Sequence, residues 1–292
     1  MENFIDESFL KKISNLKFIL KCRRRADFSG AHSDNRSGVS LEFADFKEYT
    51  PDDDFRYIDW NATARLEKII VKRFLREFDV PVYILLDLSD SMSIGSPPKS
   101  RFAAKLSVAL THIALLQNDR VGLFPFNDKL LTFAPPKSGV KQRKRIIDLL
   151  KNISPEGPTS LNNAVKSFLT SSREKGLVFI LSDFLTEEDY EEGLNRLKFR
   201  GDDIIAIQLM DPKDLDPRIP GGGTLIDAES GDKIEIGGGT LAVEEYKDKI
   251  SKFNDDLKNH LSSKGITHVL TPTDLKLEEL LFRKLRSKRV LK

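Results

Sequence analysis

The sequence predicts an α/β protein in which a doubly wound, mostly parallel sheet follows an N-terminal helix and a small β extension. Beyond residue 80, short apolar runs typical of strands buried on both faces alternate with amphipathic segments typical of helices. Such alternation requires right-handed crossovers, which place helices on both faces of a parallel sheet. We therefore expect residues 1–80 to form the helix and the β extension, and residues 81–292 to form the α/β domain.

The composition is that of a soluble globular protein. In 292 residues, 47 basic and 45 acidic side chains leave a net charge of +2, so bulk charge does not indicate a nucleic-acid partner. Cys22 is the only cysteine, which excludes an intramolecular disulfide and fits a reducing compartment. The longest apolar run, residues 80–86, is too short to span a membrane, and the acidic N-terminus lacks the order of a signal peptide. We expect a cytoplasmic protein with no membrane span and no nucleic-acid partner.

The first eighty residues contain one amphipathic segment and two short strand-like segments. Apolar residues at helical spacing predict a helix over the first twenty residues: Phe9, Ile13, Leu16 and Leu20. The polar stretch at 22–38 is predicted to be a loop. Strand-like segments follow at about 41–46 and 69–78, and the acidic run at 51–54 between them is predicted to be an exposed turn rather than a cation site.

The α/β part shows a regular order of strands and helices. Buried strands are predicted at 82–86, 121–126, 177–181, 204–209 and 267–270, with a possible return strand at 130–133. Helices are predicted at 102–116, 146–150, 161–169, 187–197, 243–261 and 275–285. Residues 211–240 interrupt this order and are predicted to form a hairpin insertion between two glycine runs.

The residues that follow each strand are candidate site residues, because ligands bind beyond the carboxyl ends of the strands in an open parallel sheet. Asp87, Ser89 and Ser91 follow the first of these strands, and Asp183 follows the third. Thr159 stands just before a predicted helix. All five are hard oxygen donors without sulfur or imidazole, which suits Mg²⁺ or Mn²⁺ and argues against zinc or copper.

The order of these five residues resembles the metal-ion-dependent adhesion site (MIDAS) of von Willebrand factor A domains. A lone Asp-x-Ser-x-Ser more often marks a turn with a helix cap. The later threonine and aspartate, each in the correct strand-to-helix context, make the pattern specific. The resemblance implies that Asp87, Ser89, Ser91, Thr159 and Asp183 hold the metal, some directly and some through water. It also implies that a free position on the metal accepts an acidic side chain of a partner.

A second resemblance covers nearly the whole chain. The segment before the α/β part resembles the hallmark of the family called domain of unknown function 58 (DUF58), whose members place it before a von Willebrand A-like domain. The matching residues are Ser37-Gly38, Glu42-Phe43, Glu48-Tyr49, Asp53-Asp54, Arg56, Ile58-Asp59-Trp60-Asn61 and Ala64-Arg65. One departure is Asp52, where the family usually has glycine. The resemblance implies a protein partner, either a MoxR-type AAA ATPase or its client, in the assembly or activation of other proteins.

Three functions fit these observations. We expect a non-enzymatic, Mg²⁺-dependent protein-binding module. An alternative is a metal-dependent phosphoryl hydrolase with Asp87 or Asp183 as base. Against it, position 89 is serine where such phosphatases often carry a second aspartate, and no lysine follows in an obvious charge-clamping place. A third possibility is an adaptor that makes its contacts through Trp60 without any metal.

Trp60 and Arg65 are candidate partner-binding residues, because tryptophan and arginine are favoured interface anchors. A structural alternative has Trp60 filling a gap in the core and Arg65 pairing with Asp59 or Asp54.

Overall fold

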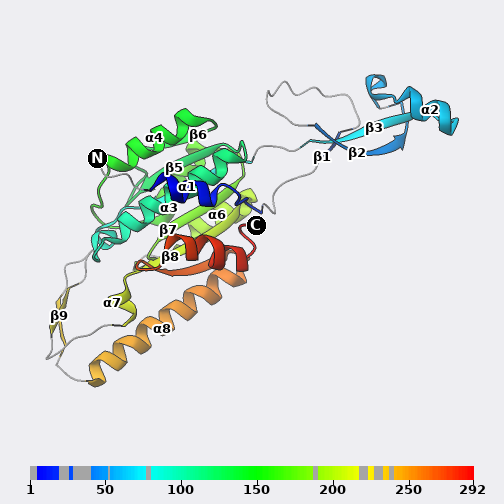
Figure 1. Cartoon of the computed structure of the whole chain (residues 1–292). Coiled ribbons are helices and arrows are strands. Elements are labelled where there is room, and N and C mark those ends of the chain that lie inside the picture. Colours follow the sequence, from blue (N-terminus) through cyan, green and yellow to red (C-terminus); the bar gives the residue numbers. More distant parts are fainter. Residues whose placement is uncertain are drawn as a thin grey trace. The chain divides into compact units, whose positions relative to one another are not determined.

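The computed structural model describes residues 5–19, 26–28, 41–51, 53–76, 80–186, 190–216, 223–226, 233–236 and 240–292. The chain forms two compact units (Figure 1). One contains residues 1–21 and 81–292 and is called here the sheet unit; the other contains residues 22–80 and is called the small unit. The features of the sequence analysis that lie outside the described residues include Leu20, Cys22, residues 37–38, Asp52, the start of the helix predicted at 187–197, the hairpin turn at 229–232 and the glycine run at 237–239.

The sheet unit is built on six strands in the order β11-β8-β7-β4-β5-β6. All neighbours pair in parallel except the edge strand β6, which is antiparallel to β5. The sheet therefore confirms the predicted α/β class with a mostly parallel sheet. The strands are β4 (Val82–Asp87), β5 (Val121–Phe126), β6 (Ala134–Lys137), β7 (Leu177–Ser182), β8 (Asp203–Met210) and β11 (Thr267–Pro272).

Helices cover both faces of this sheet, because successive side chains of a strand point to opposite faces and both sets are apolar here. In β4, Val82, Ile84 and Leu86 belong to one buried cluster, whereas Tyr83 and Leu85 belong to the other. The first face is covered by α1 (Glu7–Ile13), α3 (Lys99–Leu116), α4 (Val140–Lys151) and the C-terminal α9 (Leu277–Glu279) with the π-helical turn η3 (Leu280–Leu285). The second face is covered by α5 (Leu161–Ser171), α6 (Glu191–Arg200) and α8 (Thr240–Ser263).

The N-terminal helix belongs to the sheet unit, which corrects the predicted boundary at residue 80. Phe9 and Ile13 of α1 are buried in the same cluster as the apolar side of α3. The chain then runs beside its own C-terminus, where Lys17 and Lys292 exchange backbone hydrogen bonds of 3.1 and 2.9 Å. An amphipathic helix needs an apolar surface to cover, and the sheet unit supplies one.

The edge strand lies at a different position from the predicted one, whereas the insertion contains the predicted pair of strands. The return strand beside β5 is β6, at 134–137, rather than the predicted 130–133. This strand contains two prolines. An edge strand tolerates proline because its outer side needs no N–H donors. The insertion contains the expected antiparallel pair, formed by β9 (Gly223–Ile226) and β10 (Lys233–Ile236), and it follows the short helix α7 (Pro212–Leu215).

The described residues of the small unit form a three-stranded antiparallel sheet and one short helix. The strands are β1 (Ala26–Phe28), β2 (Leu41–Glu48) and β3 (Ile70–Arg76), in the order β1-β3-β2. The first strand lies within the stretch 22–38, which the sequence predicts to be a loop, so that prediction is wrong at this point. A 3₁₀ turn η1 (Phe55–Tyr57) and the helix α2 (Trp60–Leu66) connect β2 to β3. The side chain of Asp59 caps α2 by accepting hydrogen bonds from the backbone N–H groups of Asn61 and Ala62, both at 3.0 Å.

Across the described part of the chain, no helix is long and apolar enough to cross a bilayer. The cytoplasmic location stays a prediction.

Candidate metal centre

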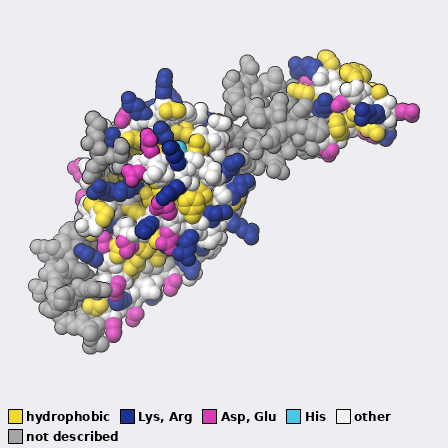
Figure 2. Space-filling model, in the orientation of Figure 1, with side chains coloured by type: hydrophobic (Ala, Val, Ile, Leu, Met, Phe, Trp, Pro, Cys, Tyr) yellow, Lys and Arg dark blue, Asp and Glu magenta, His cyan; other side chains and the backbone are white. Residues whose placement is uncertain are grey.

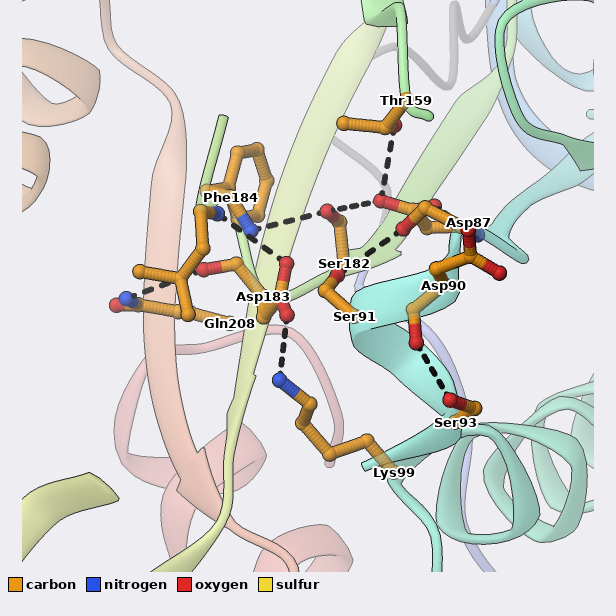
Figure 3. A network of polar contacts seen from close by, with 12 residues as sticks. Asp87, Asp90, Ser91, Ser93, Lys99, Thr159, Ser182, Asp183, Phe184 and Gln208 are labelled. Carbon is orange, nitrogen blue, oxygen red and sulfur yellow. Dashed lines mark hydrogen bonds and ion pairs between the residues drawn. The ribbon is translucent and has the colours of Figure 1, made fainter. Parts of the chain in front are cut away.

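Asp87 is the last residue of β4 and is fully buried at the carboxyl edge of the sheet. Its Oδ1 accepts a hydrogen bond from the backbone N–H of Ser89 at 2.9 Å. Its Oδ2 accepts hydrogen bonds from the hydroxyls of Ser182 at 2.5 Å and Thr159 at 3.3 Å (Figure 3). All three donors are neutral, so Asp87 is held in place without a direct ion pair to any of them.

The register of the sheet brings the candidate residues to one edge. Leu86 of β4 lies opposite Leu181 of β7, so both strands end together, and the residues after them meet. The loop after β4 is joined to the loop before α5 by two backbone hydrogen bonds of 2.8 Å, from Asp90 N–H to the Gly157 carbonyl and from Glu156 N–H to the Leu88 carbonyl. This is the convergence of loops that the sequence predicts.

The hydroxyl donors lie in the same buried network. The Oγ atoms of Ser89 and Ser91 are 3.1 Å apart, and both residues are buried. Thr159 is also buried and contacts Asp87 through the hydrogen bond described above. Hydrogen bonds thus connect Asp87, Ser89, Ser91 and Thr159 to one another, and Asp183 follows Ser182 on the next strand.

Asp183 differs from Asp87 because it is paired with a lysine. Nζ of Lys99 lies 2.5 Å from Oδ2 of Asp183, and the two side chains are 1% and 0% exposed. The other carboxylate oxygen, Oδ1, accepts a hydrogen bond from the backbone N–H of Leu185 at 3.2 Å. The sequence shows no lysine in an obvious charge-clamping place, yet the structure brings Lys99 into contact with Asp183.

The apolar pattern of α3 indicates where the side chain of Lys99 lies. Lys99 is the first residue of α3, and position 99 lies on the same stripe as the buried Phe102, Ala103 and Leu106. A residue on that stripe faces inward, and side chains in the first turn point toward the N-terminal end of a helix. The start of α3 lies at the site edge, so the stripe places the ammonium group of Lys99 there.

Two further acidic residues follow β8 and were not among the predicted ones. Asp211 is buried and caps the short helix α7 by accepting a hydrogen bond from the Lys213 N–H at 2.8 Å. Burial raises the pKa of Asp214; Lys99 opposes this rise, whereas the carboxylates of Asp211 and Asp183 add to it. These groups extend the negative charge around Lys99 beyond Asp183.

The hydrogen-bond donors to Asp87 described above are neutral, so they offset only part of the negative charge of its carboxylate. Burial, together with the nearby Asp183 carboxylate, raises the pKa of Asp87 from 3.8 to about 6, against the opposing hydrogen bonds from Ser182 and Ser89. Within the described residues, no group of three or more His, Cys, Asp or Glu side chains could hold a metal ion. The candidate set consists of three hydroxyls and two carboxylates, a hard donor set that fits Mg²⁺ or Mn²⁺.

The two predicted partner-binding residues lie elsewhere, in the small unit. Trp60 is 69% exposed and Arg65 is also exposed, so Trp60 does not fill a core gap. Asp59 pairs with Lys72 and Asp54 pairs with Arg56, which are not the pairings with Arg65 considered above. Figure 2 shows hydrophobic side chains gathered on the surface of this unit; the exposed ones include Phe46, Phe55, Trp60, Leu66 and Ile69.

Several solved structures align with most of this chain at low sequence identity and with TM-scores below 0.5. The conserved hypothetical protein BatB from Bacteroides thetaiotaomicron is 18% identical, with a TM-score of 0.46 over 72% of this chain and 97% of that one. An aerotolerance-related membrane protein from Bacteroides fragilis is 17% identical, with a TM-score of 0.48 over 71% of this chain and 99% of that one. The VWA domain of SpRpn10 is 15% identical, with a TM-score of 0.38 over 71% and 95%.

By sequence, the chain is similar to curated relatives and matches a family model. Uncharacterized proteins of Mycobacterium tuberculosis and Mycobacterium bovis are each 24% identical over 232 residues, which is 77% of this chain and 73% of each relative. The model of the family described as protein of unknown function DUF58 matches residues 45–253, which includes β4, the loop before α5 and the end of β7. The chain therefore belongs to the DUF58 family.

Proposed function

We propose that this protein is a non-enzymatic, metal-dependent protein-binding module. Asp87, Ser89, Ser91, Thr159 and Asp183 would hold Mg²⁺ or Mn²⁺ at the carboxyl edge of the sheet. The observation that carries the proposal is the buried oxygen cluster around Asp87, whose hydrogen-bond donors among the described residues are all neutral. A divalent cation bound here would supply an electrophilic position for a carboxylate of the partner.

The residues around the metal set suit binding better than catalysis. Hydroxyl oxygens outnumber carboxylates in the set, and neutral ligands leave most of a cation's charge available to an incoming acidic group. Hydrolysis of a phosphoryl group would need a cationic clamp for the substrate, and Lys99 is buried against Asp183 instead of facing a substrate. Position 89 supplies a hydroxyl rather than a second carboxylate base.

Two observations support the proposed partner: the family to which the chain belongs and the exposed residues of the small unit. The DUF58 resemblance implies a MoxR-type AAA ATPase or its client, and a cytoplasmic location fits that partner. The exposed Trp60 and Arg65 on α2 offer a second contact surface for the same protein. The adaptor alternative differs in one respect, because there the small unit would bind the partner without any metal.

A capture experiment tests this proposal. The tagged protein is incubated with a lysate of its own organism in Mg²⁺ and, separately, in EDTA, and bound proteins are identified by mass spectrometry. We expect a partner that is held in Mg²⁺, lost in EDTA and lost with Asp87→Asn. The matched control is Asp128→Asn, an exposed carboxylate in the loop after β5, which should bind like the wild type. A partner that is retained in EDTA and by Asp87→Asn would contradict the metal-dependent proposal and favour the adaptor.

A further inference from the structure

We propose that Lys99 is a built-in cation of the metal centre: it neutralises Asp183, keeps the site folded without a divalent ion and weakens the binding of that ion. This inference rests on the proposed metal-binding function and concerns how the site is tuned. It starts from the ion pair between Lys99 and Asp183, which is 2.5 Å long and closed to solvent at both ends.

The position of Lys99 is fixed by its surroundings. Its backbone N–H donates a hydrogen bond of 3.0 Å to the Ile94 carbonyl, which closes the loop between Ser91 and the start of α3. One turn further along, Phe102 and Ala103 are buried against the sheet. The ammonium group is therefore delivered to Asp183 by a packed helix, and Figure 3 shows it approaching the carboxylate from the side away from Asp87.

This pairing changes the charge that a divalent cation meets. Asp87 and Asp183 carry two negative charges when ionised, and Lys99 cancels one of them. Asp183 has one oxygen on Lys99 and the other on the Leu185 N–H, so both of its oxygens are engaged before any metal binds. Cation affinity in oxygen sites rises with the number of charged ligands, so a lysine within the set lowers it.

The same pairing explains how the site can be folded without metal. Two neighbouring buried carboxylates repel each other, and a buried charge without a partner is strongly unfavourable. Lys99 relieves this for Asp183, whereas the partners of Asp87 in the part of the chain that the structure describes are all neutral. The site would then exchange its metal reversibly, because its folding would not depend on the ion.

Three variants of the full chain test the inference. Lys99→Met removes the charge and retains an unbranched chain, and Lys99→Met with Asp183→Asn removes both charges of the pair. Lys105→Met, further along α3, is the matched control. Thermal unfolding is measured in EDTA and in Mn²⁺, and Mn²⁺ affinity is measured by electron paramagnetic resonance.

We expect Lys99→Met to unfold at a lower temperature than the wild type in EDTA, to regain stability in Mn²⁺ and to bind Mn²⁺ at least about tenfold more tightly. The double variant should be as stable as the wild type in EDTA and gain less from Mn²⁺. Lys105→Met should match the wild type in both respects. If Lys99→Met does not fold in EDTA, Lys99→Gln and preparation in Mn²⁺ allow the same affinity comparison.

The outcomes separate this inference from the proposed function. Mn²⁺ binding by the wild type that is not tightened by Lys99→Met would overturn the role of Lys99 and leave the metal-binding function standing. Mn²⁺ binding by Lys99→Met alone would support the role of Lys99 and contradict metal dependence of the natural protein. Absence of Mn²⁺ binding in both proteins would overturn both.

Discussion

Two buried aspartates, one in each unit, differ in their hydrogen-bonding partners. Asp53 is paired with a lysine, whereas Asp87 is bonded to neutral donors. In the small unit, the side chain of Asp53 is 2% exposed; its Oδ1 lies 2.6 Å from Nζ of Lys47, and its Oδ2 accepts two hydrogen bonds from Thr50. Burial alone would raise the pKa of Asp53, but the hydrogen bonds from Lys47 and Thr50 outweigh it and lower the pKa from 3.8 to about 2. Asp87 in the sheet unit has neutral donors and a carboxylate neighbour, and its pKa is raised to about 6.

Burial of a carboxylate does not by itself mark a ligand site. Asp53 was expected in an exposed turn; it is buried, and Lys47 supplies the positive charge that a cation would otherwise bring. Asp87 lacks that charge, because the nearby ammonium group is held by Asp183. A buried carboxylate whose partners are neutral is the one that gains most from a bound cation.

The largest expected effect concerns Asp87 itself. Asp87→Asn keeps the side-chain shape but removes the charge, so Mn²⁺ binding should weaken by about 100-fold or more. Without metal, the same substitution should stabilise the protein at pH 7.5, because it removes a carboxylate that is costly to ionise. Mn²⁺ titration and urea unfolding measure the two effects. Unchanged Mn²⁺ affinity in Asp87→Asn would show that Asp87 is not a ligand.

The pH dependence of stability gives a second view of Asp87. Its folded pKa lies above the unfolded value, so the folded state binds a proton more tightly than the unfolded chain. Metal-free stability should therefore fall as the pH rises from about 4 to about 6, by about 3 kcal/mol, and then level off. Asp87→Asn should lack this part of the pH profile, and a wild-type profile identical to that of Asp87→Asn would contradict the account.

Lys47→Met should make the surroundings of Asp53 resemble those of Asp87. Removing the lysine leaves a buried carboxylate with neutral donors, and Lys47 is partly exposed, so we expect a loss of about 1–2 kcal/mol in the small unit at neutral pH. In the wild type, the folded pKa of Asp53 is depressed, so its contribution is present above about pH 4 and is lost as the pH falls through about 2. Urea unfolding between pH 2 and 7 checks both statements, and a Lys47→Met profile equal to that of the wild type would contradict them.

Thr159 tests the hydroxyl part of the set. Thr159→Val removes the hydroxyl and keeps the shape, so Mn²⁺ affinity should fall by about tenfold, whereas Thr159→Ser should retain it. Isothermal titration of both variants gives the comparison. Equal affinities would mean that Thr159 only packs against Asp87.

The smallest expected effect on stability is that of Trp60→Ala. The side chain is 69% exposed, so the free energy of unfolding should change by no more than about 0.5 kcal/mol. Partner capture in the same variant shows whether this surface contributes to binding. A large loss of stability would mean that Trp60 supports the fold of the small unit.

Much of the sheet and the convergence of the site loops could be predicted from the sequence. Apolar runs buried on both faces reveal β4, β5, β7 and β8, and parallel strands bring their carboxyl ends together, which places Asp87 near Asp183. The local sequence pattern does not reveal which residues from distant segments pair in the folded protein. The burial of α1 on the sheet unit, the pairing of Lys99 with Asp183 and the pairing of Lys47 with Asp53 depend on contacts between distant segments or on side-chain direction.

The most direct test of the metal centre is the stoichiometry of Mn²⁺ binding at pH 7.5, measured by electron paramagnetic resonance for the wild type, Asp87→Asn and Asp128→Asn. We expect one Mn²⁺ per chain in the wild type and in Asp128→Asn, displaced by Mg²⁺, and none in Asp87→Asn at the same concentrations. A wild-type protein that binds no Mn²⁺, or an Asp87→Asn variant that binds it equally well, would contradict the claim that this buried oxygen cluster is a metal centre.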